Sequence, residues 1–196
     1  MSEPVLEQCE GCGKRVPGYD TVILSSEKKK SRNLCSGCFN DTMAAWHGID
    51  FQHPTFEPLT LHDADGVSHL FHFRGRLGGP GLVLDALEIK DGQPRGYEFQ
   101  VLGGLDEEPL ELFRRLHDRM RRALARKHIV EGERGPRIGD ANVVRGRIDW
   151  DDESHGELPM LVIDGKEVSW EELGRMLMTY EGFQFRLEIF DRSDET

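Results

Sequence analysis

The chain lacks long apolar runs, and this excludes a membrane-spanning helix of the usual kind. It has 196 residues, of which 37% are hydrophobic and 31% charged, a composition typical of soluble globular proteins. No stretch approaches the roughly 20 apolar residues that such a helix needs. The first 25 residues carry acids and cysteines where a signal peptide would have a basic start and an apolar stretch. We therefore expect a cytoplasmic protein with no membrane partner.

Motifs of familiar enzymes are also missing. The chain contains no His-Glu-x-x-His, no Gly-x-Ser-x-Gly and no phosphate-binding glycine loop. Its many acidic residues show no spacing that marks a general acid–base pair. Cysteine is absent after Cys38, so no thiol remains for nucleophilic chemistry if the first four bind a metal. The sequence leaves an enzyme open but gives it no support.

The excess negative charge is confined to one end of the chain. The net charge is −11, and residues 151–196 carry 13 acidic against 4 basic side chains. An acidic quarter of this kind would repel a phosphate backbone, which argues against a protein that coats nucleic acid along its whole surface. A local basic patch remains compatible with this distribution.

The four cysteines form two Cys-x-x-Cys pairs near the N-terminus, Cys9 with Cys12 and Cys35 with Cys38. Two such pairs place four thiolates on two tight turns, which is enough to complete a tetrahedral zinc shell. Glycine relaxes the dihedral limits of such turns, so Gly11 and Gly13 are expected to help the first and Gly37 the second. Disulfides are disfavoured without a secretory signal, and a thioredoxin-like dithiol would occur once, inside a βαβ unit. Four thiolates leave no open position. The spacing therefore predicts one structural Zn²⁺ rather than a catalytic one.

The order of elements around these cysteines resembles the treble-clef zinc fingers, the group that includes GATA-type and LIM fingers. A strand is expected at 21–24, an exposed hairpin tip at 25–32, and a helix at 39–47 that ends at Gly48. The resemblance covers residues 9–48 and implies that the last two ligands lie in the first turn of the helix. Members of this group bind DNA, bind proteins, or support a neighbouring domain. Trp46 is expected to cover the small core of the finger, and candidate partner contacts at the hairpin tip are Lys28, Lys29, Lys30 and Arg32.

The rest of the chain is predicted to be one α+β domain. We expect residues 1–50 to form the finger, 51–58 a proline-containing linker, and 59–196 an antiparallel sheet packed with two main helices. Four strands at 59–64, 67–74, 82–90 and 97–102 would form a meander, with a two-residue turn at Asp65-Gly66 and a looser loop at 75–81.

A basic amphipathic helix is predicted from about residue 107 to 128, with Asp106 as its N-cap. Its outer face carries seven cations. One interpretation is a nucleic-acid contact; the other, which we prefer, is a solvated face or one that docks against the acidic C-terminal quarter of the same chain or its neighbour. Candidate contacts with nucleic acid or a partner are Arg115, Arg119, Arg122 and Arg126. The inner stripe would be Leu110, Phe113, Leu116, Met120 and Leu124.

Two histidines suggest a further alternative. If Asp65-Gly66 is a two-residue turn, His62 and His69 face each other across the strands, and His72 points to the opposite face. A facing pair with Asp63 or Asp85 nearby would suit a second metal, as in a metal-dependent hydrolase. Two partly exposed strand histidines explain the pattern more simply, so we give the hydrolase little weight.

The C-terminal region is predicted to be a strand–helix–strand unit. A buried strand at 160–163 precedes the Asp164-Gly165 turn, and Ser169 with Glu172 forms a capping box. The inner stripe of that helix would be Trp170, Leu173, Leu177 and Tyr180. Residues 183–189 alternate apolar and polar side chains and predict a final strand, whereas 131–157 is expected to be mostly loop with one edge strand.

Taken together, these patterns predict a zinc-binding protein of binding or adaptor type, with a protein partner favoured. The alternative is a nucleic-acid-binding regulator that uses the lysine-rich tip and the arginine-rich helix. Residues 51–190 are also similar to an uncharacterised bacterial domain that follows a four-cysteine finger. That resemblance implies no activity and transfers no functional residue.

Overall fold

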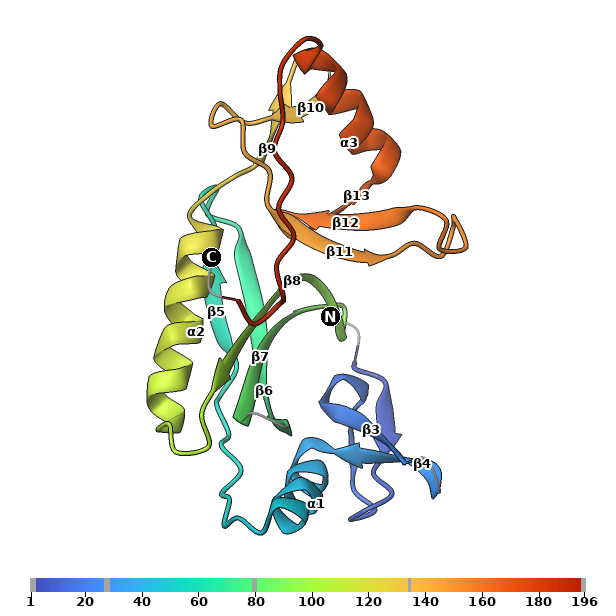
Figure 1. The fold of residues 1–196 in the computed structure, drawn as a ribbon, viewed down its shortest axis with the longest axis vertical. Coiled ribbons are helices and arrows are strands. Elements are labelled where there is room, and N and C mark those ends of the chain that lie inside the picture. The colour runs from blue at the N-terminus through green and yellow to red at the C-terminus, as the bar shows by residue number, and fades with distance from the viewer. Residues whose placement is uncertain (1–2, 27–28, 79–80, 134, 195–196) are drawn as a thin grey trace.

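The computed structural model describes residues 3–26, 29–78, 81–133 and 135–194 as a mixed α/β chain. Figure 1 shows an N-terminal unit, a central sheet flanked by a long helix, and a C-terminal unit. In the part described, the three α-helices are α1 (Ser36–His47), α2 (Pro109–Leu124) and α3 (Trp170–Leu177), with short 3₁₀ turns at Gly18–Asp20 and Met178–Tyr180. None of these helices is long and apolar enough to cross a membrane.

The N-terminal unit consists of two small hairpins and a helix. Strands β1 (Leu6–Gln8) and β2 (Arg15–Pro17) pair, as do β3 (Thr21–Ser26) and β4 (Lys29–Cys35), and α1 follows β4 directly. The helix ends at Gly48, as predicted, in a left-handed conformation with φ of +64°. Trp46, however, is 63% exposed, so the expectation that it covers the core was wrong. Leu34 and Ala44 are buried there instead.

The predicted meander is present as one four-stranded antiparallel sheet. Its strands are β5 (Leu59–His62), β6 (Ser68–Gly78), β7 (Gly81–Lys90) and β8 (Gln93–Gly103), in that order. β5 is shorter than predicted and the other three strands are longer. β6 continues to Gly78 and pairs there with Gly81, where a loose loop was expected. Asp91 and Gly92 form the two-residue turn between β7 and β8, both with positive φ. The segment 51–58 forms neither helix nor strand.

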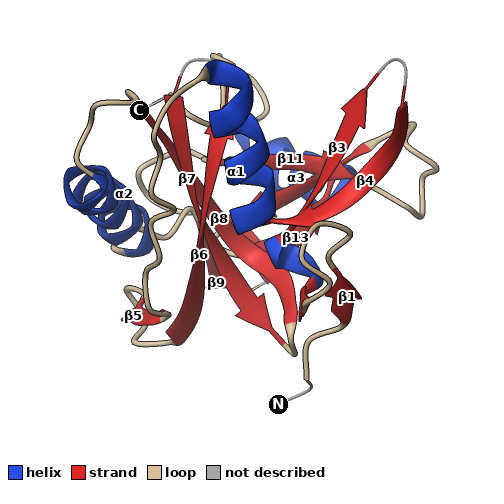
Figure 2. Cartoon of the chain, turned by 90° about the horizontal axis from the view of Figure 1, so that it is seen from below, coloured by secondary structure: helices blue, strands red, loops and turns tan. Residues whose placement is uncertain are grey.

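Helix α2 covers one face of this sheet (Figure 2). The helix is shorter than predicted, and its N-cap is Glu108 instead of Asp106. Leu110 is 71% exposed, which contradicts its assignment to the inner stripe, because the stripe follows a four-residue spacing that begins at Leu112. The buried core between helix and sheet comprises Phe71, Leu82, Leu84, Ala86, Phe99, Val101, Leu112, Leu116, Met120 and Leu124.

The N-terminal unit docks against the sheet mainly through strand β6. β5 pairs only with the first part of β6, so the remaining edge of β6 has no strand beside it among the described residues. The buried side chain of Asn40 on α1 occupies this place: its amide nitrogen donates to the Gly75 carbonyl at 2.9 Å, and its oxygen accepts from the Leu77 amide at 2.8 Å. The side-chain carboxamide of Asn40 therefore makes the two hydrogen bonds that a peptide group of a neighbouring strand would make with β6.

Tyr19 extends this contact to the face of the sheet opposite α2. Arg74 donates to the Tyr19 carbonyl at 2.8 Å, and the Tyr19 ring meets His72 edge-on with centroids 5.3 Å apart. Beside them, the buried Asp85 carboxylate accepts from Arg74, Arg76 and Gln100 at 2.7 to 3.2 Å. The two faces of the sheet thus differ: α2 packs on an apolar face, and the other face carries a charged network beside the N-terminal unit.

The C-terminal unit has its own small core. It contains the pair β9 (Ile129–Gly132) and β10 (Gly135–Ile138), and a three-stranded sheet of β11 (Gly146–Trp150), β12 (Pro159–Ile163) and β13 (Lys166–Ser169). β10 and β11 lie within the region 131–157, and β9 ends in it, whereas mostly loop with one edge strand was predicted there. The capping box is confirmed, because Ser169 accepts from the Glu172 amide at 3.2 Å and Glu172 accepts from the Ser169 amide at 2.8 Å. The buried core residues are Ile138, Leu161, Ile163, Val168 and Met176.

Two predictions for this unit were wrong. Trp170 and Leu177 are each 47% exposed, because Met176, together with the partly buried Leu173 and Tyr180, fills the inner side of α3. Residues 183–189 form no strand, and Phe185 is 89% exposed. The alternating pattern is real, but no strand of the described chain pairs with it.

Candidate metal centre

The first cysteine pair lies on a turn between β1 and β2. The Cys9 amide donates to the Lys14 carbonyl at 2.9 Å, and the Gly13 amide donates to the Cys9 carbonyl at 2.9 Å. Gly13 has a φ of +74°, a conformation that glycine adopts without strain. This turn is tied to β4, because the Glu10 amide donates to the Asn33 carbonyl at 2.8 Å.

The second pair opens helix α1. Cys35 is the N-cap residue, just before the helix, and Cys38 lies in the first turn. The first amides of a helix have no partner within it and form the positive end of the helix dipole, so they favour negatively charged sulfur. The sequence therefore brings the second pair of thiols to a helix end suited to thiolates.

Gly11 allows the two pairs to approach each other. A Cβ at Gly11 would lie 2.9 Å from both Cβ and Sγ of Cys38 and 3.3 Å from a methyl of Leu34. A Cβ at Gly37 would meet nothing within 4 Å, so the predicted need for glycine in the second turn is not found. The need for glycine lies at the first pair, where the backbone of one turn passes against the sulfur of the other.

All four sulfur atoms lie within 4.8 Å of one another, and Sγ of Cys12 and Cys35 are 4.0 Å apart. The Cys9 sulfur accepts hydrogen bonds from the Gly11 and Cys35 amides at 3.3 and 3.2 Å. Burial alone would raise the pKa of Cys9, but amide donors from Cys35, Cys12 and Gly11 outweigh it and lower the pKa to about 6.

Two of the other thiols, both half-buried, behave in the opposite way. Burial and the neighbouring sulfurs raise the pKa of Cys38 to about 12, and burial also raises the pKa of Cys35. Four thiolates cannot coexist at this distance without positive charge among them, and a bound cation supplies that charge. The donor set therefore fits one metal ion enclosed by four sulfurs, with no ligand position left for a substrate.

The predicted basic contacts are scattered rather than gathered into one surface. Lys28 lies outside the described residues, and Lys29 and Lys30 are described only as part of β4. Arg32 is exposed and donates to the Glu10 carbonyl at 3.2 Å. These residues belong to the N-terminal unit, whereas the candidate arginines Arg115, Arg119, Arg122 and Arg126 belong to α2 and the turn after it.

The arginines of the long helix divide into two groups. Arg115 pairs with Glu107 at 2.8 Å, and Arg119 donates to the Gln100 carbonyl at 2.7 Å and to the Arg192 carbonyl at 3.2 Å. Arg122 and Arg126 are exposed. Glu107, the acidic residue that pairs with Arg115, thus precedes the helix and does not belong to the C-terminal quarter. The contact described between Arg119 and that quarter is with a backbone carbonyl and not with an acidic side chain.

The two histidines of the hydrolase alternative do not face each other. Leu61 lies opposite His69, and His62 lies opposite Ser68, because the turn spans 63–67 instead of two residues. This shift of one position turns His62 to the other side of the sheet. His72 points away from His69, as predicted. Among the described residues, the four cysteines are the group placed to hold a metal ion.

His69 instead belongs to a buried polar cluster that the sequence did not reveal. Its Nδ1 lies 2.6 Å from a Glu88 carboxylate oxygen, and its Nε2 lies 3.3 Å from Asp63. Lys127 bonds the same Asp63 oxygen at 2.5 Å, and Lys90 pairs with Glu88 at 3.0 Å. These residues come from separate segments of the chain. The sequence shows each of them only as a polar residue of its own segment, and it does not show that they meet.

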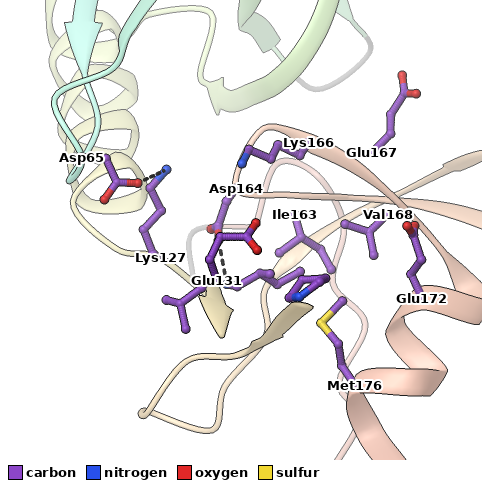
Figure 3. A pocket seen from close by; sticks show the side chains of 13 residues that line it. Asp65, Lys127, Glu131, Ile163, Asp164, Lys166, Glu167, Val168, Glu172 and Met176 are labelled. Carbon is purple, nitrogen blue, oxygen red and sulfur yellow. Dashed lines mark hydrogen bonds and ion pairs between the residues drawn. The ribbon is translucent and has the colours of Figure 1, made fainter. Parts of the chain in front are cut away.

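A shallow pocket of about 430 Å³ lies next to this cluster (Figure 3). Lys127 and Asp65 form one wall, and the β12–β13 turn with Asp164 and Lys166 forms another. Asp164 accepts from the His128 and Ile129 amides at 2.7 and 2.8 Å and so fixes the start of the C-terminal unit. Lys127 pairs with Asp65 across the wall at 3.1 Å, and the pocket lies at the joint between the central sheet and the C-terminal unit.

Three family models match successive parts of the chain. Residues 8–50 match a domain of unknown function (DUF7685), 52–125 another (DUF7686), and 128–194 a third (DUF7713). None describes an activity. No curated protein and no solved structure matches the chain significantly. The matched segments coincide with the cysteine-containing unit, the sheet with α2, and the C-terminal unit; the predicted boundaries at 50 and 58 stay a prediction.

Proposed function

We propose that Cys9, Cys12, Cys35 and Cys38 hold one structural Zn²⁺ and that the N-terminal unit is a treble-clef finger. The observation that carries this proposal is the convergence of four sulfur atoms within 4.8 Å. Zinc bound at about 2.3 Å by four thiolates places neighbouring sulfurs about 3.8 Å apart. The 4.0 Å between Cys12 and Cys35 is close to that value. Zinc suits a closed shell of four soft thiolates and then acts only as a structural ion.

The arrangement around the cysteines supports the treble-clef assignment. A turn between β1 and β2 carries the first pair, the β3–β4 hairpin follows, and the second pair opens α1. This is the order that the resemblance to treble-clef fingers implies. Because the unit buries few apolar side chains, zinc binding would supply much of its folding free energy.

We infer that the finger serves in protein binding, as part of an adaptor. Four large apolar side chains of the unit are exposed: Val5 at 64%, Leu6 at 44%, Ile23 at 71% and Trp46 at 63%. Exposed aromatic and aliphatic residues are favoured at protein interfaces, whereas a nucleic-acid surface would be dominated by cations. The net charge of −11 agrees with a protein partner.

Zinc content tests the first part of the proposal. We expect one zinc per chain by elemental analysis, and loss of most of it in Cys12→Ser and in Cys38→Ser, with Ser25→Ala as the control. Replacement by Co²⁺ should give the absorption of tetrahedral thiolate coordination. A purified chain that keeps its N-terminal fold without metal, judged by amide exchange of β3 and β4, would contradict the proposal.

The nucleic-acid alternative is supported by the exposed Arg122 and Arg126 and predicts a different result. Salt-dependent binding to duplex or single-stranded nucleic acid, weakened by Arg122→Ala with Arg126→Ala, would favour it. Nuclease-resistant association with a protein partner, abolished by Trp46→Ala while zinc content stays at one per chain, would favour the adaptor.

A further inference from the structure

The C-terminal segment of residues 183–190 exposes an unusual amount of apolar surface. The exposed fractions are 74% for Phe183, 89% for Phe185, and 72% for both Leu187 and Ile189, with Phe190 at 55%. These side chains present on the order of 600 Å² of apolar surface. Patches of this size on a folded chain mark interaction sites.

The segment is held at both ends and uncovered between them. At its start, the Phe183 amide donates to the Tyr180 carbonyl at 2.9 Å, and the two rings meet edge-on. Beyond its end, Arg192 bonds Glu98 of β8 at 2.6 Å. Figure 1 shows the segment as the dark red trace that leaves α3 and ends beside the central sheet. An extended chain fixed in this way offers both its apolar side chains and its backbone to another molecule.

The sequence of the segment is complementary to itself about Leu187. If two copies pair antiparallel with Leu187 opposite Leu187, then Phe185 lies opposite Ile189 and Arg186 lies opposite Glu188, each twice by symmetry. All apolar side chains of the central five residues then meet apolar partners, and both cations meet anions. Such cross-strand pairs are the stabilising unit of a sheet.

We propose that two copies of this chain associate through residues 183–190 as an antiparallel two-stranded ribbon centred on Leu187. The ribbon satisfies backbone groups that have no strand partner within the described chain. Two segments together carry on the order of 1,200 Å² of exposed apolar surface, and the cross-strand contacts cover part of it. The inference goes beyond the proposed zinc finger and does not depend on it.

Complementary charge variants test the pairing. Arg186 and Glu188 form an ion pair within one chain and are 85% and 46% exposed, so substitutions there leave the core intact. In Arg186→Glu, every cross-strand charge pair joins two anions, and in Glu188→Arg every pair joins two cations. We expect the wild type to sediment as a dimer, and each variant alone to dissociate with a Kd raised about tenfold or more.

Mixing the two variants restores opposite charges between chains but not within them. We therefore expect an equimolar mixture of Arg186→Glu and Glu188→Arg to form a heterodimer in sedimentation and native mass spectrometry. Circular dichroism and zinc content control for folding. A monomeric wild type at 100 µM (about the top of the useful range for such contacts), dimers of unchanged affinity in both single variants, or a mixture that stays monomeric would each overturn the proposal.

Discussion

At the scale of single residues, the spacing of four cysteines carries most of what this chain reveals. The two Cys-x-x-Cys pairs alone predicted the sulfur cluster, because each pair needs only a local turn to converge. The glycine requirement was assigned to both turns, yet only Gly11 lies against another side chain. A close approach between residues 27 positions apart depends on how the turns meet, which local spacing does not specify.

Gly11→Ala is therefore expected to weaken the metal centre. The added methyl would overlap Cys38, and relief requires the two turns to separate. We expect a loss of about 1–3 kcal/mol in unfolding free energy, together with faster zinc release to a chromogenic chelator. Gly37→Ala is the matched control: it has open space within α1, so a neutral or slightly stabilising effect is expected. Equal effects of the two substitutions would contradict the steric explanation.

At the scale of elements, the strands of the meander and the helices were predicted, but their ends and partners were often not. The pattern of 59–102 identified all four strands, because alternation reports a half-buried sheet. It did not reveal that Asn40 would complete the edge of β6. Asn40 reads as an ordinary polar helix residue, and its role arises only when α1 reaches the sheet.

Asn40→Ala is expected to loosen the docking of α1 on β6. Two hydrogen bonds to buried backbone groups are lost, leaving the Gly75 carbonyl and the Leu77 amide unpaired at a cost of about 2–4 kcal/mol. Hydrogen exchange of the Leu77 amide should accelerate accordingly, and denaturant unfolding should report the stability loss. Asp41→Ala, at the exposed neighbouring position, should change neither quantity. Unchanged exchange at Leu77 in Asn40→Ala would show that the contact is dispensable.

At the scale of the whole molecule, a buried charged cluster joins segments that lie far apart in the sequence. Asp63, His69, Glu88 and Lys127 come from the β5–β6 turn, β6, β7 and the segment after α2. Burial alone would raise the pKa of Asp63, but hydrogen bonds from Lys127, the Val67 amide, His69 and the Asp65 amide lower it below its ordinary value. The carboxylate therefore contributes to stability in its charged form.

This cluster predicts acid sensitivity. A carboxyl group with a lower pKa in the folded than in the unfolded chain stabilises the fold above about pH 4, and this contribution disappears as the pH falls toward the folded value. We expect the unfolding free energy to decline below about pH 4, by up to about 1.4 kcal/mol per pH unit for this group. Asp63→Asn should be less stable at pH 7 and show a flatter decline in urea titrations from pH 7 to 3. Asp152→Asn, at an exposed site, should leave the profile unchanged.

The sequence by itself determined the cysteine cluster, the meander, the long amphipathic helix and the capping box. Each depends on residues close together in the chain, whose periodicity or spacing is visible directly. Tertiary structure decided the partner of each polar group: Asn40 on β6, His69 between two carboxylates, and His62 turned away by a one-residue register shift. It also left the alternating segment 183–190 uncovered. Alternation fixes which side chains share a face, but contacts between distant segments depend on which surfaces remain open once the units have packed.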